Sequence, residues 1–155
     1  MTLATLMQEE LTAVESLGQL LQREYAALKS RDLADLEQVV AEKLVCADHL
    51  RKLIASRLDY LRERGIAANA PSLAAYVDSL PTTERVDANQ LWAKLERAAE
   101  QLRAQNEVNG AVITASRNHV ERTLAILRGR DSLDFLYDQD TRKVYGGGNQ
   151  PIAKA

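Results

Sequence analysis

The sequence contains few of the residues that interrupt regular secondary structure. Its 155 residues include 7 glycines and 3 prolines, so few positions favour a tight turn. Aromatic residues make up 5% of the chain, whereas the strands of β-sandwiches are rich in aromatic and β-branched side chains. Long helices use the fewest turns, and the composition therefore predicts an all-α fold.

Cysteine, an excess of one charge and long apolar runs are also lacking. The single cysteine, Cys46, excludes an internal disulfide. Because 20 basic and 22 acidic residues leave a net charge of −2, binding of nucleic acid through bulk charge is disfavoured. No apolar run approaches the roughly 20 residues of a membrane span. The first ten residues lack the basic and apolar blocks of a signal peptide, so we expect a cytoplasmic protein.

Apolar residues, 46% of the chain, are spaced as on an amphipathic helix from near residue 3 to near residue 30. Glu10 and Glu24 interrupt this apolar stripe. The stripe consists of Leu3, Met7, Val14, Leu17, Leu21 and Leu28, with Leu6, Ala13, Leu20 and Ala27 beside it.

A second helix is predicted from Asp32 to Arg64, with Asp32 as its N-cap and Gly65 after its C-terminus. The short break near residue 31 should fold the two helices into an antiparallel hairpin. The apolar face predicted to be buried comprises Leu33, Leu36, Val40, Ala47, Leu50, Ile54 and Leu61, with Leu44 and Leu58 close by.

Residues 66–87 contain most of the helix breakers, and only a short helix at about 72–80 is predicted there, ended by Pro81. A third long helix should run from about Ala88 to Leu127 and pack along the hairpin as a coiled-coil-like three-helix bundle. We expect a bundle domain over 1–129 and a flexible tail over 130–155. The seam of the third helix comprises Trp92, Leu95, Ala99, Leu102, Asn106, Asn109, Ile113, Ser116, Val120 and Leu127.

No enzyme motif is present, neither a phosphate-binding glycine loop nor a GxSxG or HExxH sequence. His49 and His119 fall on different predicted helices, and Cys46 with His49 would supply only two of the three or four ligands that zinc requires. We therefore predict no catalytic residue, no metal and no cofactor.

Two amides, Asn106 and Asn109, lie within the apolar seam of the third helix. A buried asparagine can fix the register of a coiled coil. Alternatively, this part of the helix faces water or a partner. The sequence leaves both interpretations open.

The order of several short elements resembles that of the bacterial FlgN-type flagellar export chaperones. These elements are the N-x-x-N-G sequence at Asn106–Gly110, the L-x-x-L-x-G sequence at Leu124–Gly129, Leu136-Tyr137-Asp138, a glycine-rich stretch and the terminal Ala153-Lys-Ala155. Asp140 departs from the pattern, which has a glycine there. The resemblance spans nearly the whole chain.

The resemblance implies a small helical cytoplasmic protein that is not an enzyme. Such chaperones bind the C-terminal segments of the hook–filament junction proteins, FlgK and FlgL, prevent their premature assembly and deliver them to the export apparatus. The rival interpretations are a structural coiled-coil oligomer, such as a homodimer in which the same stripes pair, and a helical enzyme with an unrecognised site.

We assign client binding to the C-terminal half of the third helix, because its apolar residues cover more of the helix surface than one seam needs. The alternative is that the short helix at 72–80 covers this surplus apolar surface. The client-binding set is Asn109, Val112, Ile113, Val120, Leu124 and Leu127. By resemblance, the tail docks on the export gate, a membrane protein with a large cytoplasmic domain, through Phe135, Leu136 and Tyr137; the alternative is that Phe135 and Leu136 cap the bundle.

Overall fold

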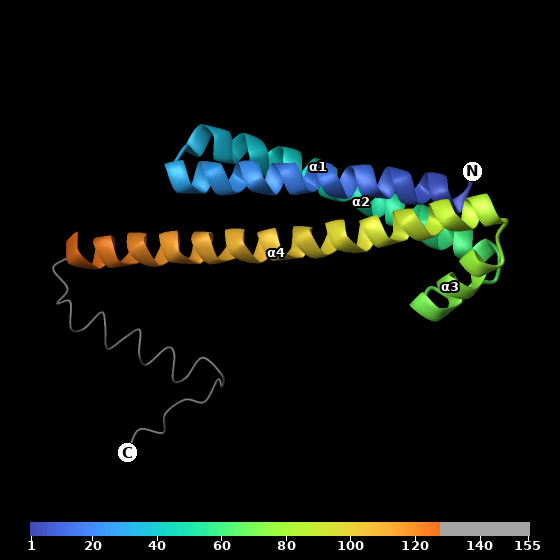
Figure 1. The fold of residues 1–155 in the computed structure, drawn as a ribbon. Helices are drawn as coiled ribbons and strands as arrows, with labels where there is room; N and C mark the ends of the chain where they lie inside the picture. The colour runs from blue at the N-terminus through green and yellow to red at the C-terminus, as the bar shows by residue number, and fades with distance from the viewer. Residues whose placement is uncertain (128–155) are drawn as a thin grey trace, which may run out of the picture. The chain divides into compact units, whose positions relative to one another are not determined.

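The computed structural model describes residues 1–127, and within them the fold consists of four α-helices (Figure 1). These are α1 (Leu3–Ser30), α2 (Leu33–Glu63), α3 (Ala70–Asp78) and α4 (Thr82–Leu127). The all-α class is therefore confirmed. The predicted tail over 130–155 lies outside the described residues. No helix among residues 1–127 combines the length and apolarity needed to cross a membrane.

Residues 1–112 form one compact unit, and the described remainder, residues 113–127, belongs to a second. In the first unit α1 and α2 pack against each other as a hairpin (Figure 1). Only Arg31 and Asp32 separate the two helices. Arg31 adopts the left-handed conformation with φ 55°, and the amide of Asp32 donates to the carbonyl of Ala27, as in a Schellman ending.

Asp32 also begins α2, because its side chain accepts a hydrogen bond from the amide of Asp35 at 3.1 Å. At the other end of α2, Gly65 takes a positive φ of 69°, and the amide of Ile66 donates to the carbonyl of Leu61. The predicted hairpin is thus confirmed, as are the Asp32 N-cap of α2 and the glycine that follows the C-terminus of α2.

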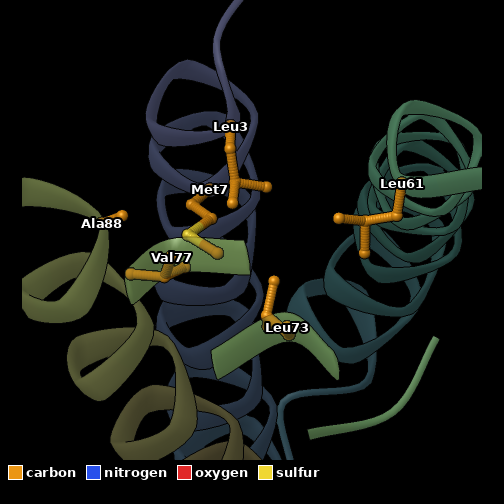
Figure 2. Close-up of a cluster of buried hydrophobic side chains, with 6 residues drawn as sticks. All are labelled: Leu3, Met7, Leu61, Leu73, Val77 and Ala88. Atoms are coloured by element: carbon orange, nitrogen blue, oxygen red, sulfur yellow. The ribbon is translucent and has the colours of Figure 1, made fainter. Parts of the chain in front are cut away.

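The core of the first unit begins where all four helices meet (Figure 2). Leu61 of α2 and Ala88 of α4 belong to this cluster. The other buried members are Leu3 and Met7 of α1, with Leu73 and Val77 of α3. A second cluster, of Leu11, Val14 and Leu95, continues the core along α1 and α4. In the first cluster, Leu73 and Val77 are four residues apart, which places both on one face of α3.

The short helix α3 is held by a cap and by an aromatic pair. Asn69 accepts from the amide of Ser72 at 2.8 Å. The Tyr60 and Tyr76 hydroxyls are 3.0 Å apart, and their rings meet edge to face. Burial and this hydrogen bond raise the pKa of the Tyr60 hydroxyl. Helix α3 therefore closes the end of the hairpin that contains the core.

Three details of the prediction were wrong. Most of the seam predicted for the third helix is exposed rather than buried, at Ala99, Asn106, Ile113, Ser116, Val120 and Leu127. Helix α4 begins at Thr82, not near Ala88, because Pro81 accepts the first helical hydrogen bond, from the amide of Arg85. The first turn is exposed, so no apolar pattern marks it. On α2, Leu61 is buried, but Leu33, Val40, Leu44 and Leu58 are exposed rather than part of the main buried surface.

Candidate functional site

A buried ion pair joins α1 to α2 near the core. Glu10 accepts from the Arg57 guanidinium through both carboxylate oxygens, at 2.6 and 3.1 Å. The guanidinium carbon also lies 5.3 Å from the centre of the Trp92 ring, a cation–π distance. One of the two glutamates that interrupt the α1 stripe thus meets a cation 47 residues away in sequence.

The second interrupting glutamate, Glu24, is only 2% exposed and forms part of a buried polar network. Lys43 of α2 donates to its Oε2 at 2.7 Å. Asn109 of α4 donates through Nδ2 to Glu24 Oε1 at 2.9 Å and to the carbonyl of Leu21 at 2.8 Å. Gln105 donates to Asn109 Oδ1 at 2.9 Å.

This network fixes α4 against the hairpin. Asn109 is 1% exposed, and moving it by one residue along α4 would leave a buried carboxylate and a buried carbonyl without this donor. The burial of Asn109 excludes the interpretation that it faces water, and its hydrogen bonds favour register control. Asn106, one turn earlier, is exposed, so the two amides of the N-x-x-N-G element have different environments.

The described residues of the second unit present an exposed apolar stripe, which we call the distal stripe. It consists of Ile113, Val120, Leu124 and Leu127, at spacings of seven, four and three residues. These spacings place the four side chains on one face of α4. Val120, Leu124 and Leu127 are 55%, 42% and 76% exposed. Such a stripe is suited to packing against another amphipathic helix.

The candidate metal and nucleophile residues do not converge. Cys46 is half-buried, its thiol lies 3.7 Å from the carbonyl oxygen of Ala13, and burial raises its pKa. His49 and His119 are exposed, on α2 and α4. Within residues 1–127 no group of three or more His, Cys, Asp or Glu side chains could hold a metal ion.

The structure divides the predicted client-binding residues between the two units. Asn109 is buried and Val112 is half-buried in the first unit, whereas the other four residues form the exposed distal stripe. Phe135, Leu136 and Tyr137 lie outside the described residues. Sequence reasoning missed the partners of Glu10 and Glu24, although charged residues inside an apolar stripe signal that a buried partner is required.

Comparison with known proteins identifies the family. The family model of the FlgN protein matches residues 1–144. A solved structure from Pseudomonas aeruginosa, described as a flagella synthesis protein FlgN, is similar with a TM-score of 0.63 and 25% sequence identity; the match covers 70% of this chain and 84% of that one. Among curated proteins no match was found. The family model covers far more than half of the sequence, and the chain belongs to the FlgN family.

Proposed function

We propose that this chain is a cytoplasmic export chaperone of the flagellar type III secretion system. It binds the C-terminal segments of hook–filament junction proteins of the FlgK and FlgL type, keeps them from assembling early and delivers them to the export apparatus. Membership of the FlgN family gives the chain a flagellar role. The protein acts by binding rather than by catalysis.

The observation that carries the proposal is the exposure of the distal stripe. Four large apolar side chains on one helical face remain open to solvent among the described residues, although burying each would contribute about 1.5–3 kcal/mol. An amphipathic client helix can bury them by packing along α4. Of the two client-binding residues that precede the stripe, Asn109 is held by hydrogen bonds to the Leu21 carbonyl and Glu24, and Val112 is half-buried.

A double charge substitution in the distal stripe tests the binding site. In Val120→Asp/Leu124→Asp, two contacts become buried carboxylates in the complex, so we expect at least a ~100-fold weaker affinity for a junction-protein C-terminal segment. Ala115→Asp/Asn118→Asp is the matched control, because its exposed residues lie on the opposite face of the same helix.

Circular dichroism must show the same helicity in both variants. Unchanged binding by a folded Val120→Asp/Leu124→Asp protein would exclude the distal stripe as the client site. If the wild-type chain instead sediments as a dimer that this variant dissociates, the stripe pairs two copies, and the rival coiled-coil oligomer is the better account.

We further propose that Phe135, Leu136 and Tyr137 dock the loaded chaperone on the cytoplasmic domain of the export gate. The support is the family resemblance together with an apolar–aromatic triplet between Asp134 and Asp138. Tyr137→Ala should bind the client normally but export it poorly in a secretion and motility assay. Normal export, or lost client binding with a lower melting temperature, would contradict this role.

A further inference from the structure

The first unit contains a groove between α1, α2 and α4 that encloses about 460 Å³. Leu21 of α1 and Leu102 of α4 lie among its apolar lining residues, and Leu44 of α2 forms part of its wall. Leu44 is 65% exposed. The groove therefore offers an apolar surface that the hairpin and α4 leave open.

Three cations line the same groove: Lys43, Arg51 and Arg103. Its lining residues, all within the described chain, include no carboxylate. The ionisable side chains of the lining are therefore all positive, although the protein as a whole has a net charge of −2. An apolar floor bordered by cations favours a ligand that is apolar in the middle and acidic at its edges.

The nearby carboxylates lie outside the lining. Lys43 pairs with the buried Glu24. Arg103 pairs with the exposed Glu100 at 2.7 Å and also interacts with the charge of Glu107. Asp48, whose charge interacts with Arg51, has its ion pair with Lys52. Exposed pairs such as Arg103–Glu100 are weak because solvent screens them, so an acidic ligand can compete for the cation.

A second groove provides an internal comparison. It encloses about 540 Å³ between α1 and α4 and also includes Leu102. Its polar lining consists of glutamines, among them Gln22 and Gln101, with Glu15, and its described lining residues include no cation. Positive charge thus marks one groove beside Leu102 and not the other.

We propose that the cationic groove binds an amphipathic helix of a partner protein whose apolar stripe is flanked by glutamate or aspartate. Apolar side chains of the partner enter between Leu44 and Leu102, and its carboxylates meet Arg51 and Arg103 at the rim. This surface lies in residues 1–112 and the distal stripe in residues 113–127. Client binding at the distal stripe and partner binding at the cationic groove can therefore be refuted independently of each other.

The test uses synthetic helical peptides of about 18 residues, or about five turns. One has a leucine stripe flanked by glutamate, and the second has lysine in place of every glutamate. Fluorescence anisotropy with the full-length chain should show saturable binding of the glutamate peptide, weakened as salt is added, and at least ~10-fold weaker binding of the lysine peptide. Equal binding of the two peptides would overturn the proposal.

Matched variants locate the site. Arg51→Gln/Arg103→Gln and Gln22→Glu/Gln101→Glu change the net charge by the same amount but in different grooves. We expect at least ~10-fold weaker binding of the glutamate peptide for the first pair and less than ~2-fold for the second. Equal losses in both would mean that bulk charge alone attracts the peptide, which overturns the proposal.

Leu44→Ser tests the apolar part of the groove. Because Leu44 is exposed, the melting temperature should stay unchanged while the affinity for the glutamate peptide falls. Unchanged affinity would contradict the proposed site. A wild-type dimer in sedimentation that Leu44→Ser converts to a monomer would assign the groove to a second copy of the chain and overturn the partner helix.

Discussion

At the residue scale, Asn109 connects α4 to both helices of the hairpin. Its amide donates to a carbonyl and a carboxylate of α1, and the same carboxylate accepts from Lys43 of α2. Buried polar groups of this kind contribute little while all partners are present and cost much when one is removed. The Asn109 amide thus adds directional hydrogen bonds to the apolar contacts by which Ala88 and Leu95 hold α4 in the first unit.

Asn109→Ala should lower the free energy of unfolding by about 1–3 kcal/mol, because it leaves one buried Glu24 oxygen without a donor and removes the side-chain hydrogen bond to the Leu21 carbonyl. Urea unfolding measures the loss. The control is Asn106→Ala, whose exposed side chain should change stability by no more than about 0.5 kcal/mol. Equal effects of the two substitutions would contradict the register role of Asn109.

The Glu10–Arg57 pair leads to a second prediction at this scale. Glu10→Ala should destabilise the protein by about 3–5 kcal/mol, because it leaves a buried guanidinium without its carboxylate. Glu10→Leu/Arg57→Met, which removes both charges, should lose less than the single substitution. Asp59→Ala, in an exposed pair with Arg62, is the control and should have almost no effect. A double variant less stable than Glu10→Ala would contradict this account.

At the scale of the element, the joint between α1 and α2 determines where the chain reverses. Asp32 ends one helix through its amide and begins the next through its carboxylate. Because Asp32 performs both tasks and only Arg31 and Asp32 separate the helices, the two helices are held antiparallel with little freedom at the joint.

Asp32→Ala should lower the free energy of unfolding by about 1 kcal/mol, since it removes the side-chain acceptor for the amide of Asp35. Asp32→Asn keeps an oxygen acceptor and should retain most of that stability. Thermal unfolding followed by circular dichroism compares the two. If both variants lost the same stability, the charge rather than the cap would be responsible.

The amphipathic pattern predicted α1 better than α2, and the reason is physical. A period of 3.6 residues shows that one face of a helix is apolar but not whether another element covers it. On α1 the face meets α4 and α3, so Leu3, Met7 and Leu17 are buried; on α2, Leu44 carries the same signal and is exposed.

The polar part of the candidate site could be predicted only in part. Glu10 and Glu24 were visible as interruptions of an apolar stripe, but their cations lie 47 and 19 residues away, a distance that no local pattern spans. The sequence showed a surplus of apolar residues on the C-terminal half of the third helix, but it also placed Ile113, Val120 and Leu127 of the distal stripe in the packed seam. The exposure of the stripe depends on tertiary structure, which the sequence pattern does not contain.

At the scale of the whole molecule, the two units have different properties. Residues 1–112 contain the core clusters, the buried ion pairs and the caps. The described part of the second unit presents large apolar side chains to solvent. A unit with its own hydrophobic core, followed by a solvent-exposed apolar helix face, is the arrangement expected of a protein that binds a helical segment of another protein.

The central claim is that this FlgN-family chain binds the C-terminal segment of a hook–filament junction protein. Isothermal titration calorimetry of the full-length chain against such a junction protein, intact and with its C-terminal segment removed, tests it most directly. We predict saturable binding to the intact protein with a negative heat-capacity change, as apolar burial requires, and no binding to the truncated one. Equal binding to both, or binding to neither, would contradict the account.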